Sequence, residues 1–373
     1  MPRAILGIPN READLLYAGG YSCADPVAWF EHRGRTFLMV NDLEIAGARR
    51  SATVDTVLPM SRYFESLRRR RVRRITLARA LGEALRERGA RRVQLPHAFP
   101  AGSLQDLRRA GIRPEVVPDP FFAGRSRKTT AEIRSIREAL RATEAGLATA
   151  VLTLAASQIR RDGRLTMGGK PLTSETLRER AERAMFAAGA VPDRSIVAGG
   201  LQGADPHHRG AGPLLAHRPI VLDFFPRHRL TGYYGDLTRT VVKGRADAWT
   251  HRAFQAVLAA QDLAIRLTRH GADGSEIHAR VCRFFEAAGY PVRRTERRRE
   301  GFFHGTGHGL GLELHEPPEL GRISGRLQAG QVITVEPGLY YARRGGIRIE
   351  DVVVVTRRGC RKLSGFPVFL EIP

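Results

Sequence analysis

Five short segments in the C-terminal half of the chain place acidic or imidazole side chains inside apolar, strand-like sequence. They are Pro219–Phe225, Tyr233–Val242, His304–Glu316, Val332–Gly338 and Gly346–Val355. A carboxylate buried in a sheet is strongly destabilising unless a cation or hydrogen-bond donors neutralise it. The pattern therefore favours a fold that gathers these charges around a common counter-charge.

Four carboxylates and one imidazole stand out in these segments: Asp223, Asp236, His308, Glu336 and Glu350. Taken singly, each has an ordinary explanation, namely a turn or cap aspartate, a structural histidine, or a salt bridge between Glu350 and Arg348. Taken together, four negative charges match two divalent cations. Oxygen-rich ligation with one nitrogen suits manganese, cobalt, iron or zinc. We therefore expect a site for two divalent metal ions that activate a water.

Local sequence suggests how the first ligands could meet. The strands that carry Asp223 and Asp236 can pair as a hairpin, because the turn-like piece Pro226–Thr231 separates them. Glycines on both sides of His308 would let the backbone approach a ligand closely. These features predict one convergent site in the C-terminal half.

The length of 373 residues suits two domains. Residues 1–125 are expected to form a small α/β domain without a catalytic motif, and the polar segment Gly124–Lys128 marks its end. Residues 126–373 are expected to form an α+β domain that begins with a long amphipathic helix. The expected strands of the first domain are 4–8, 37–40, 56–59, 93–96 and 115–118, and its helices are 75–88 and 103–110. In the second domain, the expected helices are 130–159, 174–188, 246–269 and 275–288, and 293–300 is an expected exposed loop.

The net charge of +23 has two interpretations. It could attract nucleic acid or another polyanion. However, the cations are almost all arginine, a pattern that a GC-rich genome produces along a whole chain. The densest run, Arg68–Arg74, contains no aromatic residue for base stacking. A solvated basic surface is therefore favoured, and nucleic acid is not expected as a partner.

The remaining composition indicates a soluble protein. No stretch approaches the roughly 20 apolar residues of a membrane helix, and no secretory signal is visible. Cys23, Cys282 and Cys360 are scattered and odd in number, which argues against a disulfide framework. A cytoplasmic location without membrane attachment is expected.

The order of the five segments resembles that of the pita-bread metallopeptidases (family M24). This family includes methionine aminopeptidases, aminopeptidase P, prolidase and the metal-free creatinases. The likeness is carried by HGTGHGLGLELHEPP, TVEPGLY and GIRIEDVVVV, which begin at His304, Thr334 and Gly346. It implies a pita-bread catalytic domain over 126–373 and a creatinase-like, non-catalytic N-terminal domain over 1–125.

The resemblance also implies roles for single residues. Asp223 would bind one metal, Asp236 and Glu350 would bridge both, and His308 and Glu336 would complete the other. His315 is similar to a histidine that contacts the scissile amide, and His207 to one near the leaving group, with the neighbouring His208 as the alternative. His304 is similar to a further pocket histidine. Arg348 and Thr238 are similar to residues that orient the ligands.

The implied activity is that of the Xaa-Pro branch, an aminopeptidase or a dipeptidase (prolidase). Methionine aminopeptidases lack the N-terminal domain, and creatinases lack the metal ligands. Such an enzyme would release the N-terminal residue from Xaa-Pro peptides by attack of a hydroxide that bridges two metal ions, with Glu336 moving the proton. Manganese is the expected metal, with cobalt, zinc or iron as alternatives, and a homodimer is the expected assembly.

Two other functions stay open. The first is a hydrolase of the same fold that removes methionine or cleaves another C–N bond as creatinase does. The second is a non-catalytic binding module that uses its basic surface. The chain also departs from the family, because Asp223 and Asp236 are 13 positions apart, which is longer than usual. We expect the ligands to be intact and the pocket to be reshaped by the extra residues.

Overall fold

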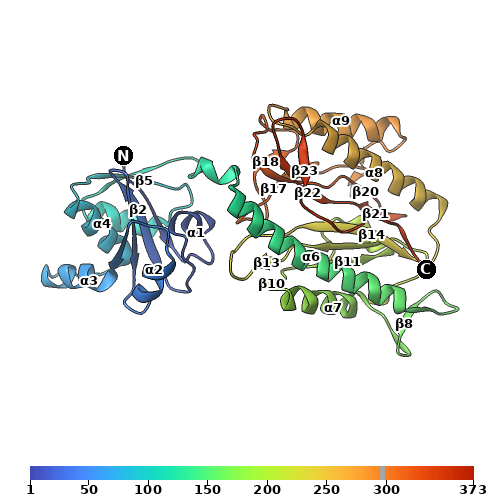
Figure 1. The fold of residues 1–373 in the computed structure, drawn as a ribbon, viewed down its shortest axis with the longest axis horizontal. Coiled ribbons are helices and arrows are strands. Elements are labelled where there is room, and N and C mark those ends of the chain that lie inside the picture. Colours follow the sequence, from blue (N-terminus) through green and yellow to red (C-terminus); the bar gives the residue numbers. More distant parts are fainter. Residues whose placement is uncertain (295–298) are drawn as a thin grey trace. The chain divides into compact units, whose positions relative to one another are not determined.

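The polypeptide divides at Arg125 into two units, Met1–Arg125 (unit 1) and Ser126–Pro373 (unit 2). The structure is a computed structural model and describes residues 1–294 and 299–373. Each unit has its own sheets, helices and buried core (Figure 1).

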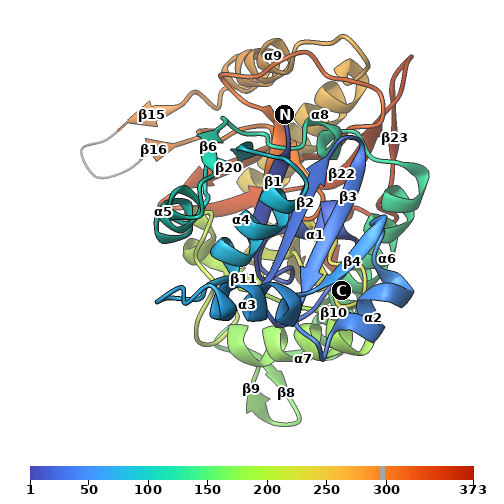
Figure 2. The same cartoon turned by 90° about the vertical axis from the view of Figure 1, so that its left-hand side faces the viewer.

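A six-stranded mixed sheet is the frame of unit 1. In chain order its strands are β1 (Arg3–Gly7), β2 (Val27–His32), β3 (Arg35–Val40), β4 (Thr56–Pro59), β5 (Arg92–Leu95) and β6 (Arg113–Val116). In space they follow the order β4-β3-β2-β1-β5-β6, and Figure 2 shows β1 to β4 side by side. The β1–β2 and β2–β3 pairs are antiparallel, and the other pairs are parallel.

Helices cover both faces of this sheet. Within unit 1, which the structure describes in full, they are α1 (Ala13–Gly19), α2 (Ile45–Ser51), α3 (Met60–Arg69), α4 (Leu77–Glu87) and α5 (Ala101–Arg109). Buried side chains of α3, α4 and α5 pack with Phe30 and Met39 on one face, and those of α1 and α2 pack with Trp29 and Leu38 on the other. Because both faces are covered, the central strands β1, β2 and β3 are largely apolar. The expected α/β class of this unit is confirmed.

Two larger sheets form the frame of unit 2. The four-stranded sheet contains, in spatial order, β11 (Ile196–Gly199), β12 (Ile220–Phe224), β14 (Leu237–Lys243) and β24 (Glu371–Ile372). The five-stranded sheet contains, in spatial order, β18 (Glu316–Leu320), β17 (Gly307–Gly309), β19 (Val332–Val335), β22 (Asp351–Val355) and β23 (Cys360–Lys362). A separate pair consists of β20 (Gly338–Tyr341) and β21 (Gly345–Arg348).

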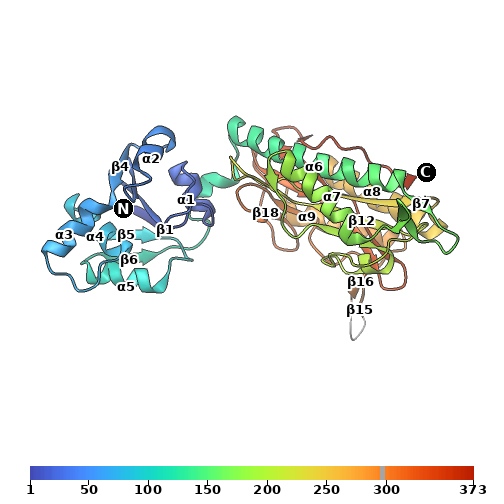
Figure 3. The same ribbon diagram turned by 90° about the horizontal axis from the view of Figure 1, so that it is seen from below.

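Long helices pack against these sheets in two pairs. They are α6 (Thr130–Ala156), α7 (Ser174–Ala187), α8 (Ala248–Leu267) and α9 (Gly274–Ala287). Helix α6 packs on α7, and α8 packs on α9 (Figures 1 and 3). In addition, α6 contacts β12 and β14, whereas α8 contacts β19, β20 and β21. Unit 2 therefore has the expected α+β architecture.

The start of α6 is set by a capping box. The side chain of Thr129 accepts a hydrogen bond from the backbone N–H of Glu132, and the Glu132 carboxylate accepts one from the backbone N–H of Thr129. The helix ends at Ala156, three residues before the expected end, because Ser157 is extended and β7 (Gln158–Ile159) follows.

The short elements of unit 2 lie between the larger ones. Strands β7, β8 (Leu165–Met167) and β9 (Lys170–Pro171) form a small sheet, and β10 (Ala190–Val191) pairs with β13 (Arg227–His228). The 3-10 turn η2 (Gly200–Ala204) also belongs to unit 2, whereas η1 (Ala123–Ser126) spans the division between the units in the sequence. Within the expected loop 293–300, β15 (Arg293–Arg294) and β16 (Arg299–Glu300) pair antiparallel, and residues 295–298 lie outside the described residues.

Across residues 1–294 and 299–373, no helix is both long enough and apolar enough to cross a membrane.

Candidate functional site

The two predicted aspartates lie at neighbouring strands of the four-stranded sheet. Asp223 is within β12, and Asp236 immediately precedes β14. The antiparallel register pairs Asp223 with Thr238, two residues beyond Asp236. Because alternate residues share a face, both carboxylates project from the same side of the sheet. The expected pairing of these strands is confirmed.

The segment between these strands differs from the prediction. It was expected to be a simple turn, but Arg227 and His228 form β13, which pairs with Ala190 and Val191 of β10. The segment between the two aspartates is therefore hydrogen-bonded to another part of unit 2.

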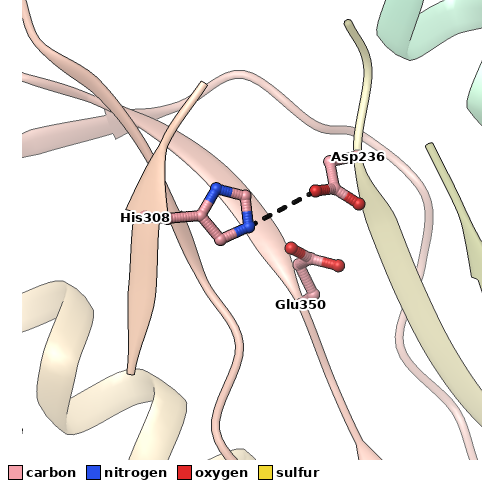
Figure 4. A group of neighbouring side chains, drawn as sticks. All are labelled: Asp236, His308 and Glu350. Atoms are coloured by element: carbon pink, nitrogen blue, oxygen red, sulfur yellow. Dashed lines mark ion pairs between the residues drawn. The ribbon is translucent and has the colours of Figure 1, made fainter. Parts of the chain in front are cut away.

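Three of the five expected ligands converge closely. One ligand atom each of Asp236, His308 and Glu350 lies within 4.8 Å of the others (Figure 4). His308 is in β17, and Glu350 lies between β21 and β22. Asp236 and Glu350 are 4% and 2% exposed, so their carboxylates are removed from water. These three side chains form the centre of the candidate site.

The sequence predicts that Glu336 and Glu350 lie inside strands, but in the structure both lie just outside them. Glu336 directly follows β19, and Glu350 directly precedes β22. The ladder between these strands ends where Val335 pairs with Asp351. Beyond it, the backbone N–H of Glu336 donates to the Thr306 carbonyl oxygen (2.8 Å), and that of Glu350 donates to the Thr238 carbonyl oxygen (3.1 Å). Leaving the ladder frees both side chains to turn toward the site.

Glu336 and Asp223 complete the group in different ways. Oε1 of Glu336 lies 3.4 Å from Nε2 of His308. Asp223 instead accepts a hydrogen bond of 2.6 Å from Nη2 of Arg348. The salt bridge between Arg348 and Glu350, which the sequence left open, is therefore not formed, and Arg348 pairs across the sheets with Asp223.

These residues surround one cavity of about 620 Å3 in unit 2. Of the predicted site residues, its lining includes His207, Asp223, Asp236, His304, His308, His315, Glu336, Arg348 and Glu350. Thr238 lies behind the cavity, where its hydroxyl donates to Oε2 of Glu350 (2.8 Å) and accepts from Nε of Arg348 (3.2 Å). His208 does not line the cavity. Its Nδ1 accepts from the backbone N–H of Gly210.

The electrostatics of the group require a counter-charge. Burial raises the pKa of Asp236 and of Glu350 well above their usual values, and neighbouring carboxylates add to both shifts. Burial also raises the pKa of Glu336 to about 7. Among the described residues, Oε1 of Glu350 is buried without a hydrogen-bond partner. Divalent cations would neutralise these groups and give Oε1 of Glu350 a partner, so the residues fit the binding of divalent metal ions.

The histidine of the group is prepared to act as a ligand. Nδ1 of His308 lies 3.1 Å from the carbonyl oxygen of Gly309, which can only accept, so Nδ1 carries the proton. Nε2 then presents its lone pair toward Asp236 and Glu336. Burial lowers the pKa of His308, which keeps the ring neutral. A neutral imidazole oriented by a backbone carbonyl is the usual state of a metal-binding histidine.

A hydrogen-bonded chain supports the cavity from one side. Nη1 of Arg348 donates to the hydroxyl of Tyr340 (2.8 Å), which lies 2.9 Å from Nε2 of His304. Nδ1 of His304 faces the carbonyl oxygen of Gly305 and carries the proton, so the Tyr340 hydroxyl donates to Nε2. Burial, with Arg348 nearby, lowers the pKa of His304 to about 3. The chain fixes the guanidinium that holds Asp223.

Tyr340 was not predicted as a site residue. It closes the TVEPGLY motif, and its neighbour Leu339 is buried in the apolar core of unit 2. Strand alternation therefore places Tyr340 on the opposite face, where a hydroxyl needs a partner. This alternation is the sequence signal that could have identified Tyr340 as a site residue.

We expect Tyr340→Phe to damage both stability and the site. The substitution would leave Nη1 of Arg348 and Nε2 of His304 without their shared partner, a loss of about 1–3 kcal/mol in the free energy of unfolding. Thermal unfolding would measure the loss. Tyr341→Phe is the matched control, because the Tyr341 ring packs against Trp249 away from the cavity. Equal behaviour of the two variants would contradict the assigned role.

Two further histidines face the cavity. The ring of His315 is 4.1 Å from that of His308, centroid to centroid, and burial lowers its pKa. The backbone N–H of His207 donates to Oδ1 of Asp205 (3.0 Å), a turn that holds His207 at the cavity. Both are exposed residues that a substrate in the cavity could contact.

The raised pKa values predict how stability depends on pH when metal is absent. The usual pKa of Glu336 is 4.5 and burial raises it to about 7, so the metal-free folded state holds the proton more tightly than the unfolded chain. This contribution to stability is complete below about pH 4.5 and is lost as pH rises through 7. We therefore expect Glu336→Gln to stabilise the metal-free protein at pH 8 and to have little effect at pH 4.5.

Thermal unfolding of the metal-free wild type and of Glu336→Gln at several pH values tests this. The difference in melting temperature should grow between pH 4.5 and 8. Glu286→Gln, at an exposed position of α9, is the control and should show no such growth. A difference that stays constant with pH would contradict the prediction.

Comparison with known proteins gives a consistent family. Residues 134–357 match the model described as metallopeptidase family M24. The uncharacterized peptidase YqhT of Bacillus subtilis (strain 168) is 38% identical over 179 residues, which is 48% of this chain and 48% of that protein. The Xaa-Pro dipeptidase of Pyrococcus furiosus is 31% identical over 172 residues, 46% of this chain and 47% of that protein. The match thus spans about half the length of these curated relatives.

Solved structures share the fold over nearly the whole chain. The X-Pro aminopeptidase of Thermotoga maritima superposes with a TM-score of 0.83 at 22% identity, covering 100% of this chain and 97% of that one. The prolidase of Pyrococcus furiosus superposes with a TM-score of 0.77 at 22% identity, covering 98% and 96%. At such identities the likeness shows the fold, and the expected pita-bread architecture is confirmed. Because the family model covers more than half of the 373 residues, the chain belongs to metallopeptidase family M24.

Proposed function

We propose that this protein is a metal-dependent peptidase that releases the N-terminal residue from peptides with proline at the second position. Asp223, Asp236, His308, Glu336 and Glu350 would hold two divalent ions. The observation that carries the proposal is the convergence of Asp236, His308 and Glu350 within 4.8 Å, buried and facing one cavity. The names of the relatives, Xaa-Pro dipeptidase and X-Pro aminopeptidase, support the choice of substrate.

The chemistry divides between the ions and the protein. When bound, two such ions supply an activated water and a Lewis acid for the scissile carbonyl. The carboxylate of Glu336 would take a proton at the cavity and deliver it to the leaving nitrogen. This transfer is needed because the scissile nitrogen can leave as an amine only after it gains a proton.

Histidines would complete the reaction. His315 lies beside His308 and can donate a hydrogen bond to the oxygen on which negative charge develops. His207 lines the cavity and would contact the leaving side of the substrate. Arg348, held by Tyr340 and Thr238, keeps Asp223 in place through their 2.6 Å contact.

Hydrolysis of a panel of peptides tests the proposal. We expect the manganese- or cobalt-loaded protein to cleave Ala-Pro peptides, to lose the activity after chelation, and to regain it when metal returns. Met-Ala peptides and creatine serve as substrates for the two other reactions of this fold. Cleavage that survives chelation or Glu336→Ala would contradict the proposal, and preference for either other substrate would replace it.

Three finer features belong to the same proposal. Manganese is the proposed metal, because its preference for oxygen ligands matches four carboxylates. A cytoplasmic location is supported by Cys23, Cys282 and Cys360, all of which are described and carry free thiols. A homodimer is proposed from the family resemblance, and the mass in solution measured by light scattering tests it.

The non-catalytic alternative makes a different prediction. A module that uses its basic surface would bind RNA at moderate salt and would need no metal. The buried carboxylates at the cavity give such a module no benefit, since they destabilise the fold without cations. Metal-independent RNA binding without hydrolysis would favour it.

A further inference from the structure

The cavity carries more negative charge than the expected metal ligands account for. Besides those ligands, its lining includes the carboxylates of Asp205 and Glu319. Arg348 is the single arginine or lysine among the described lining residues, and it is already engaged by Asp223 and Tyr340. Two bound divalent ions and Arg348 would supply five positive charges against six lining carboxylates, so the cavity would keep a net negative charge to which these two outer carboxylates contribute.

Glu319 is directed into the cavity by the sheet. It lies in β18, where the register pairs it with His308 and pairs Leu320 with Gly307. Leu320 is buried in the apolar core, so Glu319 projects from the opposite face, which it shares with His308. Residues paired in this way have Cβ atoms about 4.5–5.5 Å apart. The carboxylate therefore lies next to the expected metal ligand.

The charge of Glu319 is available to act on a substrate. Glu319 is exposed. Within the part of the chain that the structure describes, its carboxylate has no ion-pair partner. The strand register pairs Glu319 with His308, whose ring is 4.1 Å from the ring of His315, centroid to centroid. Glu319 thus acts electrostatically on two groups that face the substrate.

A free Xaa-Pro dipeptide would bring a second negative charge into this cavity. Its terminal carboxylate is joined to the proline Cα, which is bonded to the scissile nitrogen, so the carboxylate must enter with the reacting bond. In an amide or a longer peptide the same position holds a neutral carbonyl. Like charges a few ångströms apart in a partly buried cavity repel strongly.

We infer that the protein is an aminopeptidase for peptides in which the proline is followed by further residues, and that Glu319 discriminates against free dipeptides. This inference rests on the proposed Xaa-Pro activity. Asp205, in the lining of the same cavity, adds a further negative charge to it.

The ratio of kcat/KM for Ala-Pro-amide to that for Ala-Pro measures the discrimination. With the manganese-loaded protein we expect the amide, and likewise Ala-Pro-Ala, to be cleaved at least about tenfold more efficiently than the dipeptide. Glu319→Arg should move the ratio toward the dipeptide by about tenfold or more, and Glu319→Gln by less. Glu286→Arg makes the same change of net charge on an exposed part of α9 outside the cavity and should leave the ratio unchanged.

The outcomes separate this inference from the function on which it rests. If the protein cleaved neither the dipeptide nor the amide, the proposed activity itself would be contradicted. Cleavage of the dipeptide as efficiently as the amide would overturn the inference and leave the activity standing. A ratio that Glu319→Arg and Glu286→Arg change equally would remove Glu319 as its cause.

Discussion

Replacing Glu350 by glutamine is expected to lower kcat/KM at least about a thousandfold, because a metal ion contributes several kcal/mol to catalysis and each 1.4 kcal/mol is a factor of ten. Glu350 is 2% exposed, and its Oε1 has no hydrogen-bond partner in the described part of the chain. Glutamine keeps the shape and can retain the bond from Thr238, but it removes the charge that two cations would share. Activity and metal content should therefore fall together.

The comparison needs a variant that changes a carboxylate elsewhere. Glu286→Gln serves, because Glu286 is exposed on α9 and does not line the cavity. It should keep both metal and activity. If Glu350→Gln lost activity while holding as much metal as the wild type, Glu350 would not be a ligand.

Replacing His315 by alanine is the second large effect that we expect. The kcat should fall about a hundredfold or more, the range found when a donor to a developing oxyanion is removed. The KM should change much less, and the metal content should not change, because His315 faces the cavity beside His308 without being an expected ligand. Steady-state kinetics with Ala-Pro-amide and metal analysis measure both.

His270→Ala provides the control for a histidine outside the cavity. It should behave as the wild type. Loss of metal in His315→Ala would make His315 a ligand or a support of one, and an unchanged kcat would remove it from the reaction.

Much of the fold follows from local sequence. The segments Pro219–Phe225 and Tyr233–Val242 predict a pair of strands, and the structure has β12 and β14 there in antiparallel register. The Thr129–Glu132 capping box is a signal that the long helix of unit 2 starts there. The motifs around His308, Glu336 and Glu350 identify the family, which the comparisons confirm.

The elements that escaped prediction depend on tertiary contacts. Helices α1 and α2 have seven residues each, too short to be stable without packing against the sheet of unit 1. Strand β2 lies at the centre of that sheet, with β1 and β3 as neighbours, and was not predicted. The two helices form because they pack on the sheet, and β2 forms because it pairs with strands on both sides.

The pairing of side chains inside the site also depends on tertiary contacts. Arg348 lies two positions from Glu350 in the sequence, yet it pairs with Asp223, 125 positions away. The separation of Glu336 and Glu350 from their strands depends on backbone bonds to Thr306 and Thr238. Local pattern indicates which residues are chemically unusual, whereas the pairing among them is decided by how the sheets meet.

The central claim is that buried carboxylates and one imidazole hold a pair of divalent ions. Metal content per chain, measured by plasma mass spectrometry after manganese loading and extensive dialysis, tests it most directly. We expect about two ions per chain in the wild type and fewer in Glu350→Gln and Asp236→Asn. A wild type that retains no divalent ion, or variants that retain as many as the wild type, would contradict the account.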